Sequence, residues 1–125
     1  MLSAADYLAF ASLLPVPPSG LDQQFSGLNH DRLRAIAARN NIYSHLLALM
    51  RQTTMSQWDP LFVDHLQDRV RLAQRFGLLH AYHLRRVLAA FAEHGLAVMP
   101  IKGPLLSEKL YGDPTFRPSA DLDIL

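Results

Sequence analysis

The stretch IKGPLLSEKLYGDPTFRPSADLDIL, residues 101–125, decides which fold and function we expect of this 125-residue chain. Near its start, Lys102 and Gly103 directly follow an apolar run, and the stretch ends in a second apolar run that contains Asp121 and Asp123. Residues i and i+2 of a strand point to the same face. The two aspartates are therefore predicted to project side by side.

Two carboxylates held this close repel each other unless a cation neutralises them. Hard divalent ions such as Mg²⁺ take oxygen ligands and commonly share them with substrate phosphates. The pattern Asp121-Leu122-Asp123 therefore predicts a site for Mg²⁺ or Mn²⁺.

The Gly103-Pro104 step places a glycine at the expected start of a helix. Such a turn can offer backbone amides to a phosphate that approaches closely. On its own this pattern is weak, because many turns between a strand and a helix use glycine. Together with the aspartate pair it favours phosphoryl or nucleotidyl transfer, which requires phosphate and metal to be held side by side.

Local signals predict helices before residue 95. Asn29 is a suitable N-cap, and Asp59-Pro60 supplies an N-cap followed by a proline at the first helical position. The expected helices cover residues 3–14, 29–50 and 59–93. Apolar residues at helical spacing should form their buried faces: Leu33, Ile36, Ala37, Tyr43, Leu47 and Met50 in one helix, and Leu72, Phe76, Leu79, Leu84, Val87, Leu88 and Phe91 in the next.

After Gly95 the pattern changes to short apolar runs of strand length at residues 96–101 and 121–125, separated by a helix led by Pro104. We therefore predict an α+β fold, in which a helical lead-in over residues 1–95 precedes a strand–helix–strand unit over residues 96–125. Pro100 cannot donate to a ladder, so its strand should lie at an edge or be bulged there.

Composition narrows the class of protein. Half of the residues are hydrophobic and 18% are charged, which is typical of a globular domain, and the net charge of +1 is too small for a nucleic-acid footprint. The chain has no cysteine, which excludes disulfides and thiolate metal sites. A signal peptide begins with a basic segment, whereas this chain carries Asp6 in that region, so a signal peptide is not expected. No apolar run is long enough to span a bilayer, and we therefore expect a cytoplasmic protein without a membrane partner.

The block IKG…LYGD…RPSADLDIL resembles the signature of the uncharacterised nucleotidyltransferases of the DNA polymerase beta superfamily. Only this block is specific, although the resemblance extends back to the second predicted helix. Pro100 departs from the aliphatic residue that is usual there. The matching residues are Lys102, Gly103, Leu110, Tyr111, Gly112, Asp113, Pro114, Arg117, Pro118, Asp121 and Asp123.

The resemblance implies metal-dependent transfer of a nucleotidyl group from an NTP to an acceptor, which could be a protein side chain, an RNA end or a small molecule. It makes Asp121 and Asp123 the catalytic metal ligands and Gly103 part of the phosphate-binding turn. It also implies the start of a polymerase-beta-like nucleotidyltransferase core, truncated after the aspartate pair, because the third carboxylate of the family lies on a later strand.

Three side chains of the block have alternative roles. Lys102 and Arg117 are candidates to bind the triphosphate, since arginine suits bidentate phosphate recognition. Arg117 could equally pair with Asp113 or Asp121 and fix the loop. Ser119 could bond a phosphate, although a loop-capping role is favoured.

If the core is truncated, we expect little nucleotidyltransferase turnover by this chain alone. We also expect residues 121–125 to form an exposed, unpaired strand edge through which copies of the chain associate. The alternative function is a noncatalytic truncated remnant or helical interaction module, in which the helical part binds a partner. A helical nucleic-acid binder is less favoured, because arginines such as those at 69, 71, 75, 85 and 86 are more often the solvated face of a helix. His80 and His83 form a candidate metal pair, although hydrogen-bonded, partly buried histidines are the favoured interpretation.

Overall fold

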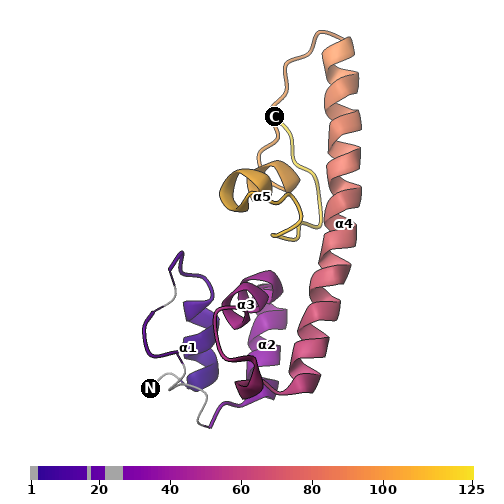
Figure 1. Ribbon diagram of the computed structural model, residues 1–125. Helices are drawn as coiled ribbons and strands as arrows, with labels where there is room; N and C mark the ends of the chain where they lie inside the picture. Colours follow the sequence, from indigo (N-terminus) through magenta and orange to yellow (C-terminus); the bar gives the residue numbers. More distant parts are fainter. Residues whose placement is uncertain (1–2, 17, 22–26) are drawn as a thin grey trace. The chain divides into compact units, whose positions relative to one another are not determined.

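The structure is a computed structural model that describes residues 3–16, 18–21 and 27–125. Within these residues the regular structure is helical (Figure 1). The elements are α1 (Ala4–Ala11), α2 (His30–Asn40), α3 (Tyr43–Met50), the short 3-10 helix η2 (Met55–Gln57), α4 (Pro60–Glu93) and α5 (Pro104–Tyr111). The chain divides into two compact units, Met1–Val70 and Arg71–Leu125, so that the division falls inside α4.

The predicted helix starts are confirmed by their caps. The Asn29 side chain accepts a hydrogen bond of 2.9 Å from the backbone N–H of Arg32 at the start of α2. Helix α4 begins at Pro60, and the Asp59 carboxylate accepts a bond of 3.1 Å from the N–H of Leu61. Each cap satisfies one of the donors that a helix N-terminus leaves without an intrahelical partner.

The single helix predicted over residues 29–50 is wrong, because the structure forms α2 and α3 in its place. Asn41 takes the left-handed conformation, with φ 54° and ψ 45°, and ends α2. The Asn40 amide meanwhile donates 2.9 Å back to the carbonyl of Ile36. Asparagine tolerates the left-handed region and competes with the helix backbone for hydrogen bonds. Two consecutive asparagines therefore interrupt an otherwise helical stretch.

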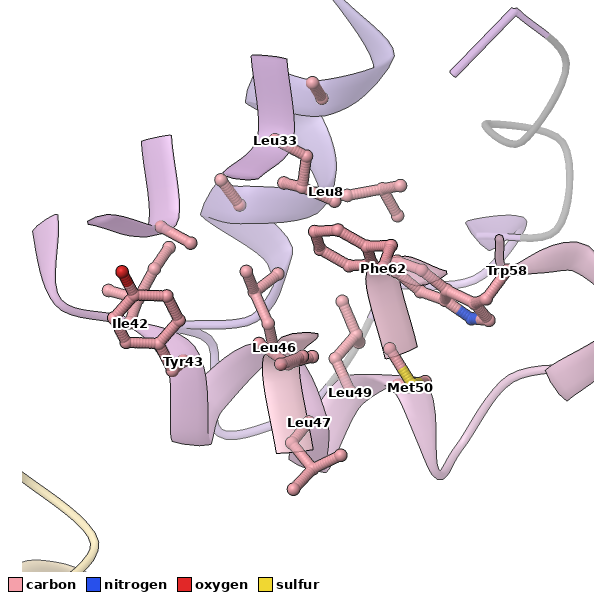
Figure 2. Packing of buried hydrophobic residues seen from close by; sticks show 14 of the residues in the cluster. Leu8, Leu33, Ile42, Tyr43, Leu46, Leu47, Leu49, Met50, Trp58 and Phe62 are labelled. Carbon is pink, nitrogen blue, oxygen red and sulfur yellow. The ribbon is translucent and has the colours of Figure 1, made fainter. Parts of the chain in front are cut away.

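The hydrophobic core of the first unit packs α1, α2 and α3 against the beginning of α4 (Figure 2). Trp58 stacks on Phe62 with ring centroids 5.8 Å apart, and its indole N–H donates 2.8 Å to the Thr53 hydroxyl. The buried face predicted for residues 33–50 is confirmed, with Ile36 only partly buried. The largest fully buried apolar side chains are Phe62, Leu8, Leu33, Leu46, Met50 and Leu66.

The buried stripe predicted for the second half of α4 is largely wrong. Leu72, Phe76 and Leu79 are 43%, 56% and 49% exposed, whereas Leu84 is buried at 6%. In the second unit only the eight-residue α5 and its connecting segments are available to cover this long helix. Helical spacing identifies an apolar face, but it does not supply a partner for that face.

The α+β prediction is wrong, because residues 3–16, 18–21 and 27–125 form no strand and no sheet. The segments predicted as strands meet only at one antiparallel bridge, between Pro100 and Ile124. Met99 and Leu125 exchange backbone hydrogen bonds of 2.9 and 2.8 Å beside it. Pro100 occupies a non-hydrogen-bonded position that needs no N–H donor. Two short segments without further strands have too few such bonds to form a ladder.

None of the helices in the described part of the chain is long and apolar enough to cross a membrane.

Asp6 connects α1 to α2 and gives the first unit a pH-dependent contribution to stability. Its carboxylate accepts bonds from the side chain and backbone N–H of Ser3, at 2.6 and 3.0 Å, and from Arg32 at 2.9 Å. These contacts, led by the Ser3 hydroxyl, lower the pKa of Asp6 from its usual value of 3.8. A lowered folded-state pKa stabilises the fold above the unfolded pKa, and this stabilisation is lost as pH falls through the folded pKa.

We therefore expect Asp6→Asn to lower the melting temperature at pH 7 and to lose most of this effect once the pH is well below about 4. Asp31→Asn is the matched control, because Asp31 also lies in the first turn of a helix but is 90% exposed and contacts Arg34 only at 3.4 Å. Thermal denaturation followed by circular dichroism between acidic and neutral pH measures both variants. Equal effects of the two substitutions at pH 7 would contradict the prediction.

Candidate functional site

The Lys102 ammonium lies between the two aspartates that the sequence singled out. Its Nζ is 2.6 Å from Asp123 Oδ2 and 4.0 Å from Asp121 Oδ1. All three side chains are partly exposed, at 52%, 36% and 67% for Lys102, Asp123 and Asp121. The i, i+2 spacing thus directs both carboxylates to one cation, even though residues 121–125 form no regular strand.

The charges of this cluster act on one another. The pKa of Lys102 is raised above its usual value of 10.5, chiefly by the hydrogen bond to Asp123 and then by the negative charges of Asp121 and Asp123. The Arg117 charge opposes this shift, which places a second cation within electrostatic range of the ammonium. The cluster therefore joins two carboxylates to two basic side chains on an accessible surface.

Gly103 forms the turn that leads from Lys102 into α5. Its φ of 86° and ψ of −147° lie in a region that is essentially restricted to glycine. A Cβ atom at this position would lie 3.5 Å from Ser119 Oγ and 3.8 Å from the carbonyl oxygen of Asp121. Glycine is therefore required by the backbone conformation, and the turn lies directly beside the segment that carries the aspartates.

A buried hydroxyl holds the loop between α5 and this segment. Ser107 is fully buried on α5, and its Oγ donates 2.7 Å to the carbonyl oxygen of Asp113. The same Oγ accepts a bond of 3.0 Å from the N–H of Arg117. Asp113 Oδ1 in turn accepts bonds of 2.7 Å from both the N–H and the hydroxyl of Thr115. Ser107 and Asp113 thus fix the backbone from which the Arg117 side chain extends.

This loop packs closely against α4, as the yellow C-terminal segment beside that helix in Figure 1 shows. A Cβ atom on Gly77 would lie only 2.9 Å from Thr115 Cα and 3.0 Å from Thr115 Cβ. Glycine is unfavourable in a helix interior, yet α4 continues through Gly77 without a break. The glycine instead makes room for the loop backbone.

The structure brings together Lys102, Gly103, Ser119, Asp121 and Asp123. Within residues 27–125 the Arg117 guanidinium forms no ion pair with either Asp113 or Asp121, so the alternative role of Arg117 in a loop-fixing ion pair is not seen in this part of the chain. Its backbone N–H fixes the loop instead. The Ser119 hydroxyl lies 3.5 Å from Nδ1 of His80.

The two histidines considered as a metal pair have different surroundings in the structure. His80 is half-buried beside Ser119, whereas His83 is exposed and contacts the ring of Tyr82 edge-on at 5.5 Å. In the described ranges no group of three or more histidine, aspartate or glutamate side chains is arranged to hold a metal ion. A cation bound by Asp121 and Asp123 would therefore complete its coordination with water or phosphate oxygens.

Sequence reasoning missed the roles of Gly77, Ser107 and Thr115 in this site, and it did not identify Ser119 as the partner of the partly buried His80. The Asp113-Pro114-Thr115 pattern carried a usable signal, because an aspartate often bonds the backbone two residues later. The other three roles depend on contacts between distant residues, which no local spacing reveals.

A family model described as "Uncharacterised nucleotidyltransferase" matches residues 26–125 of the chain. The matched stretch contains α2 to α5 and the whole Lys102, Asp121 and Asp123 cluster. No curated protein and no solved structure matches the chain.

We expect Gly77→Ala to destabilise the second unit. Alanine normally stabilises a helix interior by about 1 kcal/mol relative to glycine. Here the added methyl group meets the Thr115 backbone, and overpacking of this kind costs about 1–3 kcal/mol. Thermal and urea denaturation should therefore show a net loss of stability.

Gln74→Ala, at an exposed position three residues earlier on α4, is the control and should change stability by no more than about 0.5 kcal/mol. An increase in stability for Gly77→Ala would show that the loop does not pack on α4.

Proposed function

Because the chain belongs to the uncharacterised nucleotidyltransferase family, we propose that Lys102, Gly103, Arg117, Asp121 and Asp123 bind a nucleoside triphosphate together with Mg²⁺ or Mn²⁺. In the reaction that we propose, a nucleophile of the acceptor attacks the α-phosphorus of the NTP and pyrophosphate leaves. A protein side chain, an RNA end or a small molecule fits this chemistry as the acceptor.

The observation that supports this proposal most strongly is the convergence of Asp121 and Asp123 on one cation, the Lys102 ammonium. Both carboxylates are accessible, and hard divalent ions take such oxygen ligands. Lys102 and a divalent ion would compete for the same carboxylate oxygens. When bound there, Mg²⁺ or Mn²⁺ would supply positive charge that neutralises the phosphates and polarises the reacting one.

The basic side chains of the cluster suit the triphosphate. Arg117 is exposed and extends from a backbone that Ser107 holds in place. Its planar guanidinium can bind two phosphate oxygens at once, whereas the Lys102 ammonium acts as a point charge. The Gly103 turn presents no side chain toward the Asp121 segment and stands at the N-terminus of α5, where backbone N–H groups favour an anion. These residues would bind and orient the phosphates.

The test is isothermal titration of the protein with ATP, GTP, CTP and UTP, each in the presence of Mn²⁺. We expect Asp121→Asn and Asp123→Asn each to weaken binding of the preferred metal–nucleotide at least about tenfold, which corresponds to about 1.4 kcal/mol. The ion pairs with Lys102 are exposed and screened by water, so their loss should change stability little.

Asp64→Asn is the control, because Asp64 is an exposed carboxylate on α4 in the first unit. It should leave the affinity unchanged. If the double variant Asp121→Asn/Asp123→Asn binds every metal–nucleotide as well as the parent does, the proposed site is wrong.

A further inference from the structure

The Ser119 hydroxyl lies close both to a histidine and to the glycine turn of the candidate site. Its Oγ is 3.5 Å from His80 Nδ1 and 3.5 Å from the position that a Cβ atom of Gly103 would occupy. His80 lies 39 residues earlier in the chain, on α4. The contact therefore depends on the fold of the second unit and does not follow from local sequence.

The His80–Ser119 contact follows from the same packing that joins Gly77 to Thr115. Residues three apart on a helix lie on the same face, so Gly77 and His80 are neighbours on α4. Thr115 meets Gly77, and Ser119, four residues later in the loop, meets His80. The loop thus runs along one face of the helix and makes two contacts with it.

The chemistry of the two side chains determines what this contact can do. A serine hydroxyl has one proton to donate and two lone pairs that accept. If His80 Nδ1 accepts a hydrogen bond from Ser119, the hydroxyl proton is no longer available to another acceptor. If Nδ1 carries a proton and donates to Ser119 Oγ, the hydroxyl proton stays available for a second acceptor. A phosphate oxygen in this site is such an acceptor, since it cannot donate.

From these contacts we propose that His80 is a positioning residue that donates from Nδ1 to Ser119 Oγ and thereby directs the Ser119 hydroxyl proton toward a phosphate of the bound nucleoside triphosphate. This inference rests on the proposed function of the site. It adds that Ser119 donates a hydrogen bond to the phosphate and that His80 orients the Ser119 hydroxyl. At 3.5 Å the contact is long for a hydrogen bond, and such contacts commonly shorten when a ligand binds.

The experiment is a double-mutant cycle on nucleotide affinity, measured by isothermal titration with Mn²⁺ and the nucleoside triphosphate that the parent binds best. His80→Ala and His80→Phe both remove the donor, and phenylalanine keeps a ring in place should alanine disturb the fold. We expect each to weaken binding about threefold to tenfold, the range of a single neutral hydrogen bond. His80→Asn should restore affinity to within about twofold of the parent, because its amide can donate from a similar position.

The second half of the cycle repeats His80→Phe in a Ser119→Ala background, where we expect no further loss of affinity. His83→Ala is the matched control, since His83 is exposed on the same helix and should leave affinity unchanged. Full additivity of the His80 and Ser119 substitutions would overturn the inference, and so would a loss in His80→Asn as large as in His80→Phe.

The same titration separates this inference from the function on which it rests. If Asp123→Asn weakens binding but His80→Phe does not, only the role of His80 is overturned. If the parent binds no metal–nucleotide, or if Asp123→Asn binds as well as the parent, both are overturned.

Discussion

The close approach of Thr115 to Gly77 is the constraint on which the arrangement of the second unit depends. The loop backbone occupies the space that a side chain at residue 77 would fill. Once the loop lies there, the buried Ser107 hydroxyl can bond both the Asp113 carbonyl and the Arg117 N–H. An N–H or carbonyl left without a partner in such a place would cost about 1–3 kcal/mol, so the loop has little freedom to move away.

The charged cluster is built on this fixed backbone, but it is itself open to solvent. Lys102 is half exposed although it contacts both Asp121 and Asp123, and its raised pKa keeps it protonated well above neutral pH. Exposed ion pairs contribute little to stability, because water screens them. A ligand can therefore rearrange these charges at small cost. A rigid loop that carries loosely paired charges suits the binding of a phosphate ligand and its metal ion.

Local sequence signals predicted the parts of the structure that depend on neighbouring residues. The N-cap at Asn29 and the start of α4 at Pro60 follow from side-chain and proline chemistry, and the common direction of Asp121 and Asp123 follows from their spacing. The predicted strands do not form, because a β-ladder needs several successive bridges and the described residues provide one. The exposed stripe of α4 and the contact between His80 and Ser119 depend on tertiary packing, which periodicity does not encode. The resemblance to nucleotidyltransferases came from the block at residues 101–125, and the family match agrees with it.

The central claim is that the Lys102 and Asp121–Asp123 cluster binds a metal–nucleotide. Paramagnetic broadening of backbone amide signals by Mn²⁺ in the presence of a nucleoside triphosphate tests it most directly, because the effect reports distance from the bound ion. The account predicts selective broadening at Lys102, Gly103 and residues 119–123, with the signals of α2 and α3 unaffected. Broadening that is centred on another part of the chain, or uniform broadening that the nucleotide does not change, would contradict it.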